Sequence, residues 1–422
     1  MDKSVYTPGA GHSPRVLAGR DGLLRDWQLM LSDVAGLGRV KALDTILVGP
    51  RGVGKTALLS AFGGLSRTQG FEVINLQAVS GQGGLVSALL QQARTRIAEE
   101  AKPWQRARAV FERVGGLDLS VAGFGAGVSF QSPDPTVEAW DAGTLANALS
   151  ALAAEVRKDA PLGGVLITVD ELQAASAADL ALVAAVLHRL NVDHPMAGVV
   201  FAGTGLPHTL HVLRSAGVTH PDRLFAVEPL PLALDFDDAR YAVVEPARRS
   251  GVLWEPDAVN QVVQVSSGYP AHVQFFADAA WRTAKGPDRI TVADVEVAVP
   301  RAADQIERRT LGPRWDRITD RQMEFMAALA LLGGEATTGH IAAALGREQR
   351  EISWIREQLI AEGDVFAPKR GHLHMTVPLF RDYVLSRYES MRGDAEVRLL
   401  SLDEMRHNLV HPQLGPGDAA GI

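Results

Sequence analysis

Eight consecutive residues have the types and the spacing that bind phosphate groups. Gly49-Pro50-Arg51-Gly52-Val53-Gly54-Lys55-Thr56 fits the pattern in which four variable residues separate one glycine from a Gly-Lys-Ser/Thr triplet. Glycines let backbone N–H groups turn toward an anion, lysine adds a positive charge for the β- and γ-phosphates, and the threonine hydroxyl is a ligand for Mg²⁺. With Ala57 after them, these residues predict a site for ATP or ADP with Mg²⁺, the alternative being a glycine-rich turn without a ligand.

An acidic pair supplies the second element that ATP hydrolysis requires. Asp170-Glu171 follows the apolar run 164–169, which predicts a buried strand. Asp170 is placed to hold the Mg²⁺ shell, and Glu171 to polarise a water molecule for attack on the γ-phosphate. An acidic pair at a strand end is a weak signal by itself. Beside a phosphate-binding loop it indicates an ATPase in which Lys55 and Glu171 are catalytic.

Two more polar residues follow predicted strands. Thr204 comes after the strand 198–202 and could hydrogen-bond the γ-phosphate or the attacking water, which would make it catalytic; the alternative is a turn-forming threonine. Asn75 lies near the end of the strand 70–76 and is a candidate for restraining Glu171 until a partner binds. Asparagine is also common at strand ends for local reasons, so this role stays a hypothesis.

The elements that must position these residues alternate between strands and helices over residues 40–232. The strand 45–48 precedes the phosphate loop, a helix starts at residue 57, and a last strand is expected at 224–227. The helix turns its positive end toward the phosphates. This alternation predicts an α/β fold with a doubly wound, mostly parallel sheet. Its carboxyl edge would gather the phosphate loop, the acidic pair and Thr204.

The composition sets limits on the class of protein. The chain has 422 residues, 46% of them hydrophobic and 22% charged, which is typical of a globular protein with two or three domains. The absence of cysteine excludes disulfides, thiolate zinc sites and a cysteine nucleophile. Neither a signal peptide nor an apolar stretch of about 18 to 20 residues is evident, so we expect a cytoplasmic protein without membrane contact. The net charge of −7 gives no general attraction to nucleic acid.

Changes of pattern along the chain divide it into domains. After residue 235 the strand signal disappears and helices dominate, with Gly268-Tyr269-Pro270 as a break. Three helices and a two-stranded segment with a turn near Arg370-Gly371 then indicate a winged helix. We expect a flexible arm (1–15), an ATPase core (16–232) with a β-hairpin insertion of open role (117–130), a helical lid (233–312), a winged helix (313–390) and an extended tail (391–422) of which 399–409 could dock.

The order of these motifs carries a family resemblance. From the N-terminus they are the segment 17–21, the phosphate loop, Asp170-Glu171, Thr204, the segment 222–225, the break 268–270 and the winged helix. Over roughly residues 15–390 the chain resembles the AAA+ ATPases, specifically the origin-recognition-like branch that borders the STAND signalling ATPases. The resemblance implies a P-loop ATPase that forms a homo-oligomer on binding ATP.

The resemblance also implies roles for residues outside the phosphate loop. Val16, Leu17 and Arg20 match the segment beside the adenine, and Arg223 matches a region that often supplies an arginine finger to the neighbouring subunit. A surface arginine or a salt bridge is the alternative for Arg223. The lid departs from the family pattern, because His272 stands where many relatives place an arginine that senses the γ-phosphate. An ordinary lid histidine is the alternative, and lid closure driven by the nucleotide is therefore in doubt.

The predicted winged helix offers a surface for duplex DNA. Such domains usually place the third helix in the major groove and the wing on phosphates, which here would use Arg350 and Trp354 of the helix and Lys369 and Arg370 of the wing. Residues 316–390 contain nine Lys plus Arg against eleven Asp plus Glu, a net charge of −2. Phosphate contacts dominate DNA affinity, so this charge is unfavourable. Packing against the ATPase domain or against a partner protein is an open alternative.

Two functions therefore stay open at the level of sequence. One is a DNA-associated ATPase, slow or stimulated by a partner, in which ATP binding builds an oligomer. The other is a STAND-like signalling or defence switch, in which the winged helix makes protein contacts, locks the ADP form and binds no DNA. Both use the same active site. A P-loop domain that has lost ATPase activity is a third alternative.

Overall fold

The computed structural model describes residues 3–9, 11–36, 44–80, 84–115, 141–286, 288–393, 395 and 397–411. The predicted hairpin at 117–130 lies outside these residues. The chain forms two compact units. The sheet unit comprises the described residues of 20–48 and 55–230, and the helical unit those of 1–19, 49–54 and 231–422.

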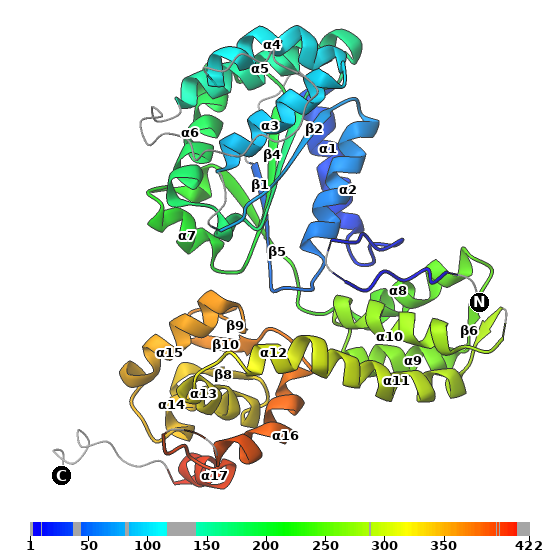
Figure 1. Cartoon of the computed structure of the whole chain (residues 1–422), viewed down its shortest axis with the longest axis vertical. Coiled ribbons are helices and arrows are strands. Elements are labelled where there is room, and N and C mark those ends of the chain that lie inside the picture. Colours follow the sequence, from blue (N-terminus) through cyan, green and yellow to red (C-terminus); the bar gives the residue numbers. More distant parts are fainter. Residues whose placement is uncertain are drawn as a thin grey trace, which may run out of the picture. The chain divides into compact units, whose positions relative to one another are not determined.

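The sheet unit is built on a parallel five-stranded sheet in the order β2-β3-β4-β1-β5 (Figure 1). The predicted doubly wound, mostly parallel sheet is confirmed. The central strands run through buried apolar residues, which explains why their sequences lack the alternation of a half-exposed strand. The strands are β1 (Asp44–Val48), β2 (Glu72–Gln77), β3 (Val165–Asp170), β4 (Val199–Gly205) and β5 (Phe225–Pro229).

Helices cover both faces of this sheet. In Figure 1, α1 and α2 lie on one side, and α3, α4, α5 and α6 lie on the other. Side-chain caps begin two of them, because Asp141 accepts a hydrogen bond from the Thr144 amide and Ser176 from the Asp179 amide. The helices are α1 (Asp21–Gly36), α2 (Lys55–Thr68), α3 (Leu85–Ala98), α4 (Lys102–Gly115), α5 (Ala142–Asp159), α6 (Ala177–Asp193) and α7 (Thr209–Ser215), with the short turns η1 (Leu172–Ala174) and η2 (Pro221–Arg223).

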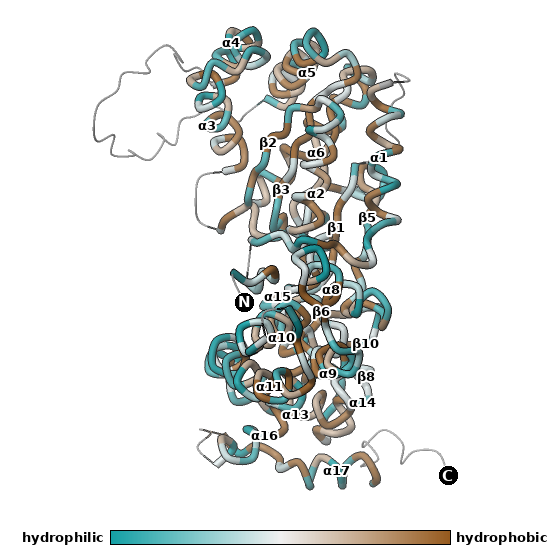
Figure 2. The backbone as a smooth tube through the Cα atoms, turned by 90° about the vertical axis from the view of Figure 1, so that its right-hand side faces the viewer, coloured by the Kyte–Doolittle hydropathy of each residue, from teal (hydrophilic) through white to brown (hydrophobic). Residues whose placement is uncertain are grey.

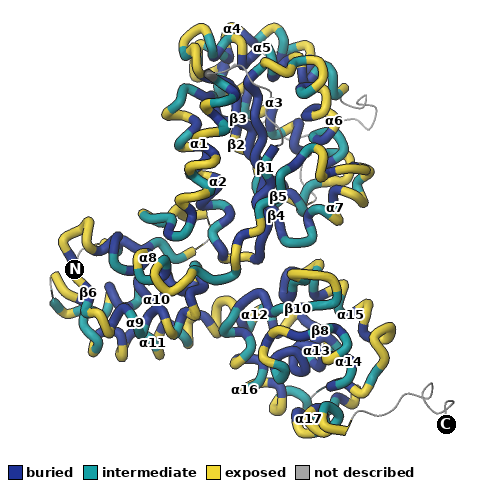
Figure 3. Tube along the Cα trace, turned by 180° about the vertical axis from the view of Figure 1, so that it is seen from behind, coloured by how far each residue is buried: buried dark blue, intermediate teal, exposed yellow. Residues whose placement is uncertain are grey.

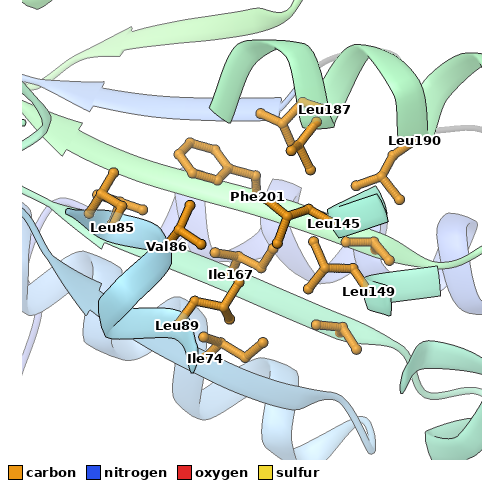
Figure 4. Close-up of a cluster of buried hydrophobic side chains, with 14 of the residues drawn as sticks. Ile74, Leu85, Val86, Leu89, Leu145, Leu149, Ile167, Leu187, Leu190 and Phe201 are labelled. Carbon is orange, nitrogen blue, oxygen red and sulfur yellow. The ribbon is translucent and has the colours of Figure 1, made fainter. Parts of the chain in front are cut away.

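An apolar core lies between the sheet and the second group of helices. Leucines of α3, α5 and α6 pack on isoleucines and a phenylalanine of the strands (Figure 4). In Figure 2 the central strands of this sheet are largely brown while the helices alternate between teal and brown, and in Figure 3 these central strands are mostly dark blue. Removal of this apolar surface from water holds the carboxyl edge of the sheet in place. The residues labelled in Figure 4 are Ile74, Leu85, Val86, Leu89, Leu145, Leu149, Ile167, Leu187, Leu190 and Phe201.

The helical unit begins with a lid of packed helices. A capping box at Thr291 starts α11, and Pro270 occupies the first turn of α10, where its missing N–H costs no hydrogen bond. A short parallel pair, β6 (Leu253–Trp254) and β7 (Arg289–Ile290), also occurs where no strand is expected. The helices are α8 (Phe236–Arg248), α9 (Pro256–Ser266), α10 (Pro270–Thr283) and α11 (Val292–Ile306), followed by the π-helical turn η3 (Glu307–Leu311) and α12 (Gly312–Trp315).

The N-terminal residues pack on this lid, so the expectation of a flexible arm is wrong for residues 5–7. The side chains of Val5 and Tyr6 are each 3% exposed. The Tyr6 hydroxyl donates to the carbonyl of Val243 and accepts from the indole of Trp254 at 2.9 Å. Burial of Val5 and of one aromatic ring with two hydrogen bonds offsets the cost of ordering this short segment.

The C-terminal part of the helical unit combines helices with a three-stranded antiparallel sheet in the order β8-β10-β9. A capping box at Thr319 starts α13, and Gly363 ends α15 in the left-handed conformation that glycine adopts most readily. The elements are α13 (Asp320–Leu331), β8 (Glu335–Thr337), α14 (Thr338–Ala344), α15 (Gln349–Glu362), β9 (Val365–Phe366), β10 (His372–Met375) and α16 (Phe380–Arg392).

A last helix, α17 (Leu402–Val410), occurs where the sequence predicts an extended tail. Ser401 and Glu404 form a capping box at its start, and the side-chain amide of Asn408 donates to the carbonyl of Ala344 at 3.1 Å. Met405 is fully buried. The expectation of an extended tail is therefore wrong for 402–410, and the alternative of docking holds there. Among the described residues, no helix combines the length and the apolar character needed to span a bilayer.

Candidate functional site

The register of the sheet unit brings the predicted polar residues to one edge. Leu47, next to the last residue of β1, pairs with Thr204 of β4, and Gln77 at the end of β2 pairs with Asp170 of β3. Parallel strands end at a common edge, so Asp170 and Thr204 meet although 34 residues separate them in sequence. Thr56, in the first turn of α2, reaches the same edge.

Thr56 and Asp170 are in direct contact. The threonine hydroxyl donates to Asp170 Oδ2 at 2.8 Å. Two oxygens of the kind that Mg²⁺ prefers are thus adjacent, as the sequence predicts for its metal ligands. No cluster of three or more His, Asp or Glu side chains suited to a metal is found in the described parts of the chain. This donor set fits Mg²⁺, which usually takes one or two protein ligands and completes its shell with water and phosphate oxygens.

Thr204 joins the two members of the acidic pair. Its side chain is fully buried, and its hydroxyl donates to Asp170 Oδ1 in a short hydrogen bond while accepting the backbone N–H of Glu171 at 3.1 Å. Asp170 Oδ1 also accepts that N–H at 3.1 Å. The predicted site residues Thr56, Asp170, Glu171 and Thr204 therefore form one connected hydrogen-bonded group.

Glu171 has an uncommon backbone conformation. Its φ of 58° and ψ of 45° lie in the left-handed region, which only three non-glycine residues of the described chain occupy. Such a conformation costs roughly 1 to 2 kcal/mol and persists only where neighbouring contacts enforce it. The hydrogen bonds that the Glu171 N–H donates to Thr204 and Asp170 are those contacts. Strain of this kind concentrates at functional positions, which agrees with the catalytic role predicted for Glu171.

The partner of the Glu171 carboxylate is a residue that the sequence reasoning missed. Gln173 Nε2 donates to Glu171 Oε2 in a short hydrogen bond. Asn75, the residue expected to restrain Glu171, instead accepts from the hydroxyl of Thr168 at 2.9 Å. The signal in the sequence that could have found this partner is the side-chain amide of Gln173, two residues after Glu171. It comes within reach of the carboxylate because Glu171 has the left-handed conformation.

The phosphate loop and the lid are in contact within the helical unit. The Tyr269 hydroxyl donates to the carbonyl of Arg51 in a short hydrogen bond, and the Ala271 amide donates to the carbonyl of Gly52 at 3.1 Å. Tyr269 is 3% exposed, and burial raises its pKa to about 12. Gly52 has a φ of 82°, and a Cβ there would overlap the Tyr269 hydroxyl. The sequence predicts only a break between helices at Gly268-Tyr269-Pro270. In the structure, Tyr269 and the neighbouring Ala271 bind backbone carbonyls of the phosphate loop.

His272 does not carry the charge that a phosphate sensor needs. Its side chain is 4% exposed, and burial lowers its pKa to about 4. Its ring lies edge-on to Tyr269 and Phe276, and its Nδ1 has no hydrogen-bond partner among the residues that the structure describes. A neutral imidazole among aromatic rings supports the alternative of an ordinary lid histidine.

The other predicted site residues are distributed over both units. In the sheet unit, Arg20, Lys55 and Ala57 are buried, and Arg223 is exposed at the end of η2. An exposed arginine is accessible to a neighbouring molecule, as the predicted finger requires. In the helical unit, the loop residues Gly49, Pro50 and Val53 are buried, Arg51 and Gly52 are exposed, and Gly54, Val16 and Leu17 are half-buried.

The candidate DNA-contacting residues are all exposed. Arg350 and Trp354 lie on the outer face of α15, Trp354 being 50% exposed, and Lys369 and Arg370 lie in the turn between β9 and β10. The opposite face of α15 is buried through Ile352, Ile355 and Leu359, whose spacing of three and four residues places them on one side of a helix. Arg350 is paired with Glu348 at 2.7 Å, and this neighbouring negative charge weakens the attraction of Arg350 for a phosphate group.

Several other arginines of this domain are held in internal ion pairs. Two carboxylates, Asp364 and Glu324, are fully buried and each is paired with two arginines. Buried carboxylates require such pairing, because an unpaired charge in the interior is very costly. These arginines therefore stabilise the domain and are not free to neutralise phosphates. They are Arg314 and Arg317 on Asp364, and Arg321 and Arg347 on Glu324.

Comparison with known proteins gives two family matches. Residues 16–200 match the AAA ATPase domain, and residues 308–384 match a domain of unknown function. No curated protein sequence is significantly similar to the chain.

Solved structures share the fold. A Walker-type ATPase of Pyrococcus abyssi has a TM-score of 0.58 at 16% identity, over 88% of this chain and 96% of its own. The ORC2 protein of Aeropyrum pernix, solved in complexes with ADPNP and ADP, has a TM-score of 0.56 at 15% identity, over 93% and 99%.

Proposed function

Because residues 16–200 form an AAA+ P-loop ATPase domain and the chain has the fold of the origin-recognition proteins, we propose that it binds ATP with Mg²⁺ and hydrolyses it as a nucleotide-dependent switch. The observation that carries this proposal is the connected group of Thr56, Asp170, Thr204 and Glu171. A P-loop domain without catalytic function would not require a strained glutamate whose backbone N–H is bound by both Thr204 and Asp170.

The residues of this group and Lys55 divide the work of hydrolysis. Glu171 takes a proton from water as the water oxygen bonds to the γ-phosphorus and the bond to the bridging oxygen of ADP breaks. Lys55 stabilises the charge that develops on the phosphate oxygens. Thr204, which is bound to both acidic residues, keeps Glu171 and Asp170 in a fixed relation. When bound, Mg²⁺ would be held by Thr56 and Asp170 and would neutralise negative charge on the phosphates.

Phosphate release from Mg-ATP tests this proposal. Glu171→Gln keeps the size and the polar head of the side chain but removes the base, so we expect ATP binding to persist and turnover to fall by about two orders of magnitude or more. Lys55→Ala should weaken the binding itself. A wild-type chain that binds ATP without releasing phosphate would contradict the hydrolysis and favour an inactive P-loop domain.

We also propose that ATP binding builds a homo-oligomer in which Arg223 acts on the nucleotide of a neighbouring subunit. The support is that Arg223 is exposed and has no ion-pair partner within the part of the chain that the structure describes. An arginine supplied in trans stabilises transition-state charge. Arg223→Ala should then abolish the turnover that depends on oligomer formation. Mixing this variant with the Glu171→Gln chain should restore part of the activity, because the second chain supplies Arg223 to the intact site of the first.

The C-terminal domain is proposed to be a winged helix that contacts duplex DNA. The order of α13, β8, α14, α15, β9 and β10, with Trp354, Lys369 and Arg370 exposed, supports this assignment. Since four arginines of the domain are held on its two buried carboxylates, one copy should bind DNA weakly, and several copies in an oligomer should bind through avidity.

Affinity for duplex DNA, measured with and without ATP at defined salt, tests this part. We expect ATP-dependent binding that weakens with salt and that Lys369→Glu with Arg370→Glu abolishes. If DNA binding does not depend on ATP and those changes do not weaken it, the assignment of this surface to DNA is wrong.

A STAND-like switch is the second candidate, and the contact between lid and phosphate loop favours it. Tyr269 and Ala271 bind the backbone of the loop directly, so a change of loop conformation with the nucleotide would reach the lid. This candidate predicts a compact ADP-bound monomer that becomes larger with ATP and binds no DNA. Light scattering in both nucleotide states measures the change of size, and an equal size in both states would contradict it.

A further inference from the structure

Gln173 makes two hydrogen bonds that together connect Glu171 to the next strand. Its Nε2 donates to Glu171 Oε2, and its Oε1 accepts the backbone N–H of Leu206 at 3.0 Å. Leu206 directly follows β4, the strand that carries Thr204. One amide therefore bridges the carboxylate of the proposed base and the segment after the neighbouring strand.

Both ends of this bridge rest on rigid parts of the sheet unit. Gln173 belongs to the turn η1, which Leu172 anchors: this side chain is 1% exposed and lies so close to Gly203 that a Cβ there would overlap it. At the other end, Leu206 is 2% exposed, and its carbonyl accepts the Thr209 hydroxyl at 2.6 Å. The amide of Gln173 is therefore held at a fixed place.

A bridge of this kind fixes the orientation of the Glu171 carboxylate. The backbone of Glu171 is fixed by Thr204 and Asp170, but its side chain can still rotate about its own bonds. A hydrogen bond from a neutral amide holds Oε2 without adding charge and leaves Oε1 to accept a proton. We propose that Gln173 is the positioning residue that aims the Glu171 carboxylate during ATP hydrolysis, an inference that rests on the proposed function.

Two substitutions separate the ends of the bridge. Gln173→Met has nearly the same volume and removes both hydrogen bonds. Gln173→Glu can still accept from Leu206 but cannot donate to Glu171, and it places a like charge beside it. We expect kcat to fall about tenfold or more in both variants with the KM for ATP unchanged, because a misplaced base affects the chemical step and not binding.

The test measures steady-state ATP turnover in four chains: wild type, Gln173→Met, Glu171→Gln and the double variant. If Gln173 acts through Glu171, the double variant has the residual turnover of Glu171→Gln alone. A general structural role would lower that residual turnover further. Gln105→Met is the matched control, since Gln105 of α4 also donates a hydrogen bond from its side-chain amide, in its case to the backbone carbonyl of Ile97 in α3.

The outcomes distinguish this inference from the function on which it rests. Two results with an active wild-type protein would overturn the inference alone. In the first, Gln173→Met leaves the turnover unchanged. In the second, Gln173→Met lowers the turnover by the same factor in the wild-type and in the Glu171→Gln background. Wild-type protein without turnover would overturn the inference and the hydrolysis together. A loss of kcat that depends on Glu171 supports both.

Discussion

Removing the hydroxyl of Tyr269 tests whether the lid prepares the phosphate loop for a nucleotide. In Tyr269→Phe the ring stays in its buried place, and only the hydrogen bond to the carbonyl of Arg51 is lost. The neighbouring bond from the Ala271 amide to the Gly52 carbonyl remains. The loop is thus loosened at one of these two described attachments to the lid.

The size of the effect follows from that single bond. A neutral hydrogen bond contributes about 1 kcal/mol net, which corresponds to about a fivefold change in an equilibrium constant. If the bond helps to order the free loop, the nucleotide must supply this free energy on binding, and its Kd should rise about fivefold. Gly52→Ala should weaken binding more, because its φ of 82° disfavours alanine and its Cβ would overlap the Tyr269 hydroxyl.

Calorimetric titration of wild-type and variant chains with ADP measures these constants. Tyr241→Phe is the matched control: it removes a hydroxyl from a 46% exposed tyrosine of α8 and should leave the affinity unchanged. Folding is checked by circular dichroism. If Tyr269→Phe is folded and binds ADP within about twofold of the wild type, the lid does not pre-order the loop, and the reasoning is wrong.

The remaining predictions concern stability. Tyr6→Phe should lower the free energy of unfolding in urea by about 2 kcal/mol or more, because it leaves the buried Trp254 indole without its acceptor and removes the hydrogen bond to the Val243 carbonyl; a loss no larger than that of Tyr241→Phe would count against an anchored N-terminus. His272 should make the protein less stable in acid. Its pKa is about 4 when folded and 6.5 ordinarily, so its neutral form is favoured by folding, and about 3 kcal/mol of stability should be lost as the pH falls from about 6.5 to about 4. His272→Phe should reduce this loss, and an unchanged pH profile of unfolding would refute the assignment.

The sequence by itself determined which residues could perform the chemistry. The spacing of Gly49, Lys55 and Thr56 and the apolar runs before Asp170 and Thr204 are local signals, because strand burial and loop conformation depend on neighbours a few residues away. From them the parallel sheet and the edge where Asp170 meets Thr204 could be predicted. The exposed and buried faces of α15 followed in the same way from helical periodicity.

Only the tertiary structure decided how these residues are held. Gln173 reaches Glu171 because Glu171 takes a left-handed conformation, and that conformation depends on Thr204, a residue 33 positions away. The burial of Tyr6 depends on Val243 and Trp254, more than 230 positions distant. The neutral state of His272 and the contact of Tyr269 with Arg51 likewise arise from packing. Such contacts leave no periodic trace in a single sequence, since each depends on where the whole chain places two distant residues.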